Sequence, residues 1–389
     1  MTVSKADRIN SLLTTTGTCV SIYMPTQTAG PETRQNPIRF KNLLSQTQEK
    51  LIQTGWQKPE IADLLQPVLE LDRNEFWQHQ QQGLAIFIAP NLFQFYQLPE
   101  SFPEQVIIST HFQLKPLIPR VLNDQQFFLL ALSQNQVRFF QGSRYAIEEI
   151  QLPDSAPTSL AEALKYDDPE EQLQAHTANP NPAAGQSMIY HGQGVGTTDN
   201  KDQIRRFLQN VNRGLDVFLE RGIMADERLP LVLAGVEYLV SMYQRVSQYS
   251  HLLEPAVMGN PEHTPIEELH QQAWEIVMDY FEQEQHQTLT RYHELIGSQA
   301  VGTSADLEEI VKAAYYGRVD SLFIASGEKH LGQFDPKTNQ VTTQEQSQSQ
   351  GQDLLNFATI HTLLNSGRVY VHELAEMPDH RQAVAILRY

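Results

Sequence analysis

The sequence predicts an α/β protein with three consecutive domains, at residues 1–123, 124–264 and 265–389. We expect a mixed sheet and a glycine-rich loop in the middle domain, and a small α/β sandwich in the last. Three observations lead to this prediction. The length of 389 residues exceeds what one hydrophobic core usually serves. Short β-rich runs alternate with amphipathic helical runs. Breaks around Pro116–Asp124 and at Pro265 separate three such series.

The first domain combines predicted helices with a β-hairpin. Its helices are expected at Ala6–Leu13, Asn36–Leu51 and Ile61–Gln80. Its strands are expected at Thr18–Pro25, Leu84–Ile88 and Leu92–Leu98, where β-forming residues gather between turn signals. Asn36 is expected to cap the second helix, because Pro37 suits the first helical turn.

The middle domain opens with a meander of three strands, the clearest β signal in the sequence. The strands are expected at Phe127–Leu132, Gln136–Gln141 and Ala146–Leu152. A polar stretch, Asp154–Asp199, follows and contains a short helix near Ser159–Tyr166. A helix, a buried strand and a helix then alternate, at Asp199–Arg221, Leu231–Gly235 and from Val236 onward. Such alternation is typical of parallel pairing, so together with the meander it predicts a mixed sheet.

The last domain begins at Thr264-Pro265-Ile266-Glu267, where a cap, a proline and an acid predict a helix that reaches Ile296. Further helices are expected at Asp306–Tyr316 and Asp353–Asn365, and strands at Ser321–Ala325, Arg368–His372 and Gln382–Tyr389. Val341–Gln352 is a low-complexity polar insertion, which we expect to be a mobile loop.

Composition excludes several classes of protein. The net charge of -18 disfavours broad, sequence-blind nucleic-acid binding unless cations gather locally. The single cysteine, Cys19, excludes an internal disulfide framework and is expected to act as a small hydrophobe in a buried strand. No apolar run approaches the roughly 20 residues of a membrane helix. We therefore expect a cytoplasmic protein without membrane contact, metal or cofactor.

Standard catalytic motifs such as HExxH, GxSxG and the P-loop are missing from the sequence. One segment stands apart, the glycine-rich turn Tyr190–Gly196 directly before a predicted helix. Its glycines would let the backbone approach a ligand, and a helix N-terminus favours anions, although the spacing alone favours a flexible loop.

The helix that follows carries Lys201, Arg205 and Arg206 near its start and Arg213 two turns on. Cations near a helix start oppose its dipole, which indicates an external anion such as an RNA phosphate. A solvated basic face explains the same residues equally well.

Five stretches carry a resemblance to a known family, in the same order along the chain. They are Ser21–Pro25, Asn36–Leu51, Leu231–Gly235, Ala305–Leu322 and Ala383–Tyr389. They resemble, in turn, the first strand, the long helix, the strand after the catalytic-loop helix, the opening of the last domain and its final Ala-Ile-Leu-Arg-aromatic strand. The family is that of the three-domain archaeo-eukaryotic class-I release factors and the ribosome-rescue factor Pelota, by way of its bacterial offshoots, family 3 among them.

Two functional motifs of that family differ here. Release factors read stop codons with an Asn-Ile-Lys-Ser loop, whereas this chain has Gln35-Asn36-Pro37-Ile38-Arg39 in the corresponding stretch. They hydrolyse peptidyl-tRNA with Gly-Gly-Gln, whereas this chain has Gly194-Val195-Gly196 there or, with one gap, Gly192-Gln193. The resemblance thus implies a factor without stop-codon reading and with a degraded hydrolysis motif.

The resemblance implies a ribosome-associated factor in rescue or silencing, which would bind ribosomal or transfer RNA and a protein partner through its C-terminal domain. Two alternatives stay open: a peptidyl-tRNA ester hydrolase with Gln193 as its catalytic residue, and a non-catalytic adaptor that binds proteins. The residues expected to bind are His191, Gly192, Gly194, Gly196, Lys201, Arg205, Arg206 and Arg39.

Overall fold

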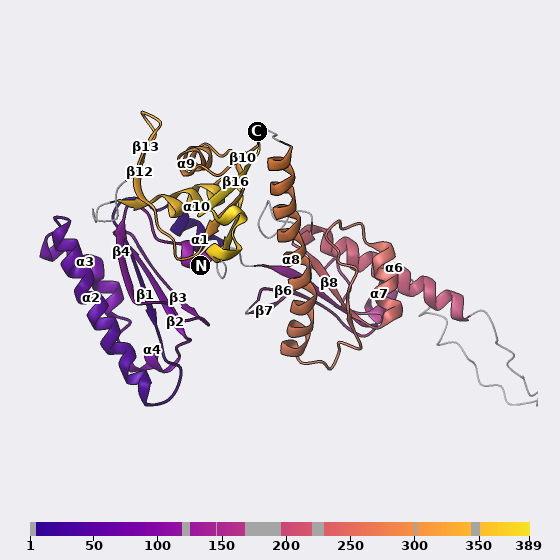
Figure 1. Cartoon of the computed structure of the whole chain (residues 1–389). Helices are drawn as coiled ribbons and strands as arrows, with labels where there is room; N and C mark the ends of the chain where they lie inside the picture. Colours follow the sequence, from indigo (N-terminus) through magenta and orange to yellow (C-terminus); the bar gives the residue numbers. More distant parts are fainter. Residues whose placement is uncertain are drawn as a thin grey trace, which may run out of the picture. The chain divides into compact units, whose positions relative to one another are not determined.

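The computed structural model shows a mixed α/β chain and describes residues 5–118, 125–144, 146–167, 196–219, 229–298, 302–343 and 351–389. The chain divides into two compact units. One contains residues 1–123 and 287–389, and the other contains residues 124–286 (Figure 1). Each of the three segments predicted as domains holds at least one sheet of its own, which confirms the α/β fold class.

The N-terminal segment is an antiparallel sheet with helices on both faces. Its strands are β1 (Cys19–Pro25), β2 (Gly83–Ala89), β3 (Leu92–Leu98) and β4 (Gln105–Ser109), in the order β3-β2-β1-β4. Its helices are α1 (Lys5–Thr14), α2 (Gln35–Gln53), α3 (Lys58–Leu69) and α4 (Asn74–Gln78). Alternate residues of β1 point to opposite faces: Val20 and Ile22 pack with α2 and α3, while Cys19 and Tyr23 pack in a second cluster with α1.

Two helix predictions in this segment need correction. The helix expected over Ile61–Gln80 is two helices, α3 and α4, separated by a turn at residues 70–73. The turn brings the Trp77 side chain to Asp72, to whose Oδ1 it donates a hydrogen bond (3.1 Å), and to the Phe40 ring. Asn36 does not cap α2, which starts one residue earlier. Its buried side chain instead holds the preceding turn, with both its amide atoms bonded to the backbone of Gln27 (2.9 and 3.0 Å).

The middle segment holds the predicted mixed sheet. Its strands are β5 (Phe127–Leu132), β6 (Val137–Gly142), β7 (Ile147–Ile150), β8 (Leu231–Gly235) and β9 (Val257–Met258). The order is β7-β6-β5-β8-β9, antiparallel along the meander and parallel from β5 through β8 to β9. This confirms the mixed sheet. The two-residue β9 was not predicted.

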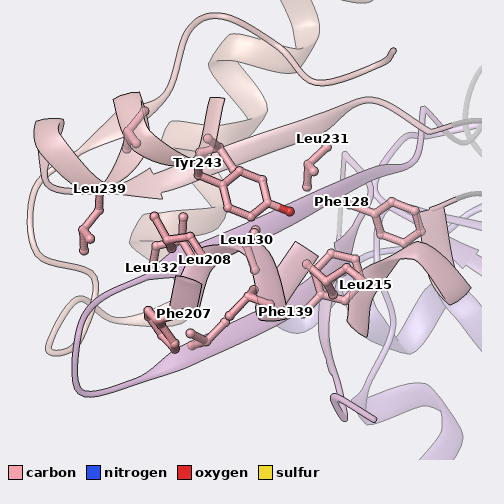
Figure 2. Close-up of a cluster of buried hydrophobic side chains, with 14 of the residues drawn as sticks. Phe128, Leu130, Leu132, Phe139, Phe207, Leu208, Leu215, Leu231, Leu239 and Tyr243 are labelled. Atoms are coloured by element: carbon pink, nitrogen blue, oxygen red, sulfur yellow. The ribbon is translucent and has the colours of Figure 1, made fainter. Parts of the chain in front are cut away.

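Two helical layers cover the two faces of this sheet. One face packs on α5 (Leu160–Asp167), α6 (Gly196–Leu219) and α7 (Glu237–Val246). Figure 2 shows this cluster, where Leu130 and Leu132 of β5 lie beside Leu208 of α6. Apolar residues three and four apart form the buried stripe of α6, so its opposite side is left for solvent.

The other face of the middle sheet packs on the first turns of α8 (Ile266–Gly297). The boundary predicted at Pro265 falls directly before this helix. Its buried residues Leu269, Ala273 and Val277 belong to the middle cluster, whereas Tyr292 near its end packs with the C-terminal segment. None of the described helices is long and apolar enough to cross a membrane.

The C-terminal segment contains two small sheets. The first combines β10 (Thr303–Ser304), β11 (Val319–Ala325), β15 (Arg368–His372) and β16 (Ala383–Leu387), in the order β10-β16-β11-β15. Helices α9 (Leu307–Tyr315) and α10 (Leu354–Leu364) cover one face of it, and Tyr292 and Met377 cover the other. The layered α/β arrangement agrees with the predicted sandwich.

The second small sheet corrects the prediction of a loop over Val341–Gln352. It consists of β12 (Leu331–Asp335), β13 (Gln340–Thr343) and β14 (Gln352–Asp353), in the order β13-β12-β14. β13 is an edge strand with mostly exposed side chains, so its polar composition is compatible with a strand. Residues 344–350 lie outside the described ranges.

Candidate functional site

Helix α6 carries the basic residues singled out from the sequence. It begins at Gly196, three residues before the predicted start, and buries Ile204, Phe207, Leu208, Val211, Leu215 and Leu219. Because these residues fix the helix rotation, Lys201, Arg205, Arg206 and Arg213 are directed away from the core, and all four are exposed.

These four cations differ from several others in their pairing. In the N-terminal segment, Arg39 Nε lies 3.4 Å from Glu104 and Lys41 Nζ lies 3.1 Å from Asp72. By contrast, no carboxylate in the described ranges forms an ion pair with Lys201, Arg205, Arg206 or Arg213. In a chain of net charge -18, four exposed cations that form no ion pair within the described ranges favour an anion from outside.

The other predicted site residues are distributed as follows. His191, Gly192, Gln193 and Gly194 lie outside the described residues, so the glycine-rich turn stays a prediction. Gly196 is the first residue of α6. Arg39 belongs to the other compact unit, where it is half-buried in its ion pair with Glu104.

Sequence reasoning missed a polar groove in the middle unit. It has a volume of about 660 Å³ and lies between the second half of α6 and the residues that follow α7. Asn212, Arg213 and Asp216 line it from α6, and Tyr249 lines it from the opposite side. The spacing of Asn212 and Asp216, one helical turn apart on a polar face, was the available signal.

The environments of Cys19 and His361 keep both side chains uncharged near neutral pH. Burial raises the pKa of the Cys19 thiol to about 12, so the thiol stays protonated near neutral pH. Burial and the neighbouring His111 lower the pKa of His361 to about 4, so its ring is uncharged there. Within the described ranges, no group of three or more His, Cys, Asp or Glu side chains could hold a metal ion.

Comparisons with known proteins agree with the resemblance seen in the sequence. Residues 127–279 match the model of bacterial archaeo-eukaryotic release factor family 7, which confirms release-factor-like character for the middle segment. The matching family is number 7, where the residues suggested family 3. No curated protein matches the chain.

Several solved structures are similar to the chain, with low sequence identity and low TM-scores. Dom34 of S. cerevisiae, a translation termination-like factor, is 11% identical with a TM-score of 0.37, covering 77% of this chain and 74% of that one. Pelota of Archaeoglobus fulgidus is 12% identical with a TM-score of 0.29, covering 79% of each. The archaeal termination factor aRF1 is 11% identical with a TM-score of 0.22, covering 99% and 97%.

Proposed function

We propose that this release-factor-like chain is a ribosome-associated translation factor that contacts RNA through the basic face of α6. The observation that carries the proposal is the row Lys201, Arg205, Arg206 and Arg213, exposed and without a described acidic partner in a strongly acidic protein. The row lies within residues 127–279, which match the release-factor family model. Local cations can bind phosphates while the net charge discourages unspecific binding.

The start of α2 supports a role other than stop-codon reading. In release factors the codon-reading residues form a loop, whereas Gln35–Arg39 here lie in the first turns of a helix. Asn36 is fully buried and bonded to Gln27, and Arg39 pairs with Glu104. Side chains engaged within the protein are poorly placed to read a codon, so ribosome rescue or silencing is the role we propose.

Charge reversal on α6 tests the proposal. We expect Arg205→Glu/Arg206→Glu to weaken co-sedimentation with 70S ribosomes and to flatten its salt dependence. If each arginine contacts one phosphate, the slope of log affinity against log salt becomes shallower by roughly 1.8, since each contact adds about 0.9 on a duplex. Both side chains are exposed, so we expect the unfolding free energy to change by less than about 0.5 kcal/mol.

The matched control is Lys58→Glu/Lys337→Glu, which changes the net charge equally at two exposed sites outside the middle segment. This variant should keep ribosome binding near the wild-type level. Equal binding of the α6 variant and the wild type at every salt concentration would refute the RNA contact and favour a protein-binding adaptor. Hydrolysis of peptidyl-tRNA that disappears in Gln193→Ala would instead make the chain an esterase.

A further inference from the structure

The turn between β11 and β12 lies at a place where α/β sheets commonly bind ligands. β11 runs parallel to β15, and the two strands end together, at Ala325 and His372. Crevices outside the carboxyl ends of parallel strands are frequent ligand sites. The turn that starts there, Ser326–His330, is in one compact unit with the N-terminal segment. Side chains from both ends of the sequence can therefore reach it.

The backbone of this turn is open to an external group. Gly327 has a φ of 75°, which glycine adopts without strain, and nothing lies within 4 Å of the position that a Cβ atom would take on it. Within the described ranges the backbone N–H groups of Gly327, Glu328 and Lys329 form no hydrogen bond, whereas those of Ser326 and His330 do. Successive open N–H groups at a glycine turn suit an anion.

Three lysines from separate segments meet at the turn. Lys115 Nζ donates to the Glu328 carbonyl oxygen, so it lies against the turn itself. Lys50, in the last turn of α2, donates to the Val106 carbonyl oxygen (2.7 Å). Lys329 is close enough to repel both of these ammonium groups. Burial and, second, this repulsion lower the pKa of Lys50.

A carboxylate pairs with only one of these lysines. Lys115 forms a buried ion pair with Asp353 (3.3 Å). The side chain of Glu328 accepts a hydrogen bond from a glutamine amide, and its charge attracts Lys115. No carboxylate in the described ranges forms an ion pair with Lys50 or Lys329. Two such cations held near each other in a chain of net charge -18 favour an anion from outside.

We propose that this turn binds a phosphate group, which accepts hydrogen bonds from the ammonium groups of Lys50 and Lys329 and from the backbone N–H groups at Gly327. An ammonium has three donors, and Lys50 uses one of them on Val106. A glycine turn with a lysine beside it offers the same kinds of donor as other phosphate sites. The bound phosphate offsets the repulsion between the lysines and links α2 to the turn, so it stabilises this compact unit.

The phosphate belongs either to a small ligand or to RNA. A free phosphate or a phosphate monoester carries about two negative charges near neutral pH, whereas each phosphodiester of RNA carries one. Two lysines therefore match the small ligand better. The inference does not rest on the proposed RNA contact, because α6 belongs to the other compact unit.

Calorimetric titration of the full chain with inorganic phosphate tests the site. We expect binding with a Kd in the millimolar range or below. Titrations with AMP and with a single-stranded tetra-adenylate that lacks terminal phosphates distinguish the two sources. Binding of phosphate and AMP identifies a small ligand, and binding of the oligonucleotide alone identifies an RNA phosphate.

Lys329→Gln isolates the contribution of one charge. The side chain is exposed, so the variant should fold. It should weaken phosphate binding about tenfold or more, since one hydrogen bond to a charged group contributes that much. Lys337→Gln, at an exposed lysine beyond the other end of β12, is the matched control and should bind phosphate like the wild type.

Thermal unfolding adds a readout that a purely structural role of Lys329 would not give. Without phosphate, Lys329→Gln should have the wild-type Tm or a slightly higher one, because the repulsion of Lys50 is removed. Phosphate in about tenfold excess over its Kd should raise the Tm of the wild type by about 3–6 °C relative to sodium chloride of equal ionic strength. The variant should gain much less.

The proposal is overturned if neither phosphate nor the oligonucleotide binds, or if chloride of equal ionic strength raises the Tm as much as phosphate does. Equal phosphate binding by the wild type and by Lys329→Gln, folded as judged by circular dichroism, would reveal an adventitious ion only. Arg205→Glu/Arg206→Glu should keep wild-type phosphate binding, so a failure of the proposed ribosome contact leaves this titration result intact.

Discussion

His361 shows how one half-buried side chain connects distant parts of the sequence. Its ring lies on α10 with centroids 4.2 Å from Phe357 and 5.1 Å from Tyr315, and 6.2 Å from His111. The aromatic surroundings penalise the charged imidazolium, and the second histidine adds repulsion. Both histidines therefore have lowered pKa values and are uncharged in the folded protein near neutral pH.

This environment predicts a loss of stability in acid. The pKa of His361 is about 6.5 in the unfolded chain and about 4 in the folded one, so the unfolded chain binds more protons between these values. The contribution of His361 to stability is complete above pH 6.5 and is lost as the pH approaches 4. The full shift would correspond to about 3 kcal/mol, at about 1.4 kcal/mol per unit of pKa, and solvent screening of this partly exposed ring reduces the expected loss to about 1–2 kcal/mol.

The measurement is the unfolding free energy from denaturant titrations at several pH values and constant ionic strength. His361→Phe keeps a ring of similar shape and should remove most of this pH dependence, leaving the part that His111 contributes. His263→Phe, at an exposed histidine, should keep the wild-type slope. An unchanged slope in His361→Phe would show that the acid sensitivity arises elsewhere.

At the scale of elements, α6 depends on a glycine inside the helix. A Cβ atom on Gly214 would lie 2.3 Å from Ala156 Cβ and 2.7 Å from its Cα, so the helix and the segment before α5 touch through backbone. Glycine usually weakens a helix by about 1 kcal/mol relative to alanine. Here the close approach requires it.

We therefore expect Gly214→Ala to destabilise the middle unit. The clash costs about 1–3 kcal/mol, which exceeds or offsets the gain in helix propensity, so the expected net loss is about 1 kcal/mol. Denaturant unfolding followed by circular dichroism measures it. Gln203→Ala, on the exposed side of the same helix, is the control and should be neutral or slightly stabilising. A stabilised Gly214→Ala protein would mean that the two segments separate easily.

At the scale of the whole molecule, residues far apart in sequence form one compact unit. Lys115 Nζ lies 3.3 Å from Asp353 Oδ2, and both side chains are 6% exposed. Gln113 donates to the same carboxylate oxygen (3.1 Å), and Lys115 also donates to the Glu328 carbonyl oxygen. Asn356 Oδ1 accepts from the backbone N–H of Leu114 (2.8 Å). The segment after β4 is thus fastened to the start of α10 by a buried polar network.

A double-mutant cycle tests this network. Lys115→Met leaves the Asp353 carboxylate buried without its cation, which should cost about 3–5 kcal/mol. Asp353→Asn should cost a similar amount through Lys115, although asparagine can still cap α10. The double variant should recover part of the loss, with a coupling energy of about 0.5–3 kcal/mol in denaturant unfolding. Additive effects would show that the two charges do not stabilise each other.

The three-domain division remains a proposal at this scale. Each segment has its own sheet, but the first and third share one compact unit, and α8 supplies buried residues to clusters on both sides of residue 286. The boundary predicted at Pro265 rests on the local signals that start α8. The sequence of α8 carries no signal of the point at which its packing changes from the middle sheet to the C-terminal segment.

The sequence by itself determined most helices and strands of the described ranges, because their apolar residues repeat with the period of the element and their ends carry turn signals. It also determined which side of α6 is basic. Only the tertiary structure decided that the helix expected over Ile61–Gln80 breaks so that Trp77 reaches Phe40, that Asn36 holds a turn, and that Val341–Thr343 pair as a strand. The groove at Asn212, Asp216 and Tyr249 was likewise invisible, since its two sides are some 30 residues apart in sequence. Periodicity is local and can be seen in a sequence, whereas these contacts depend on which surfaces meet when the chain packs.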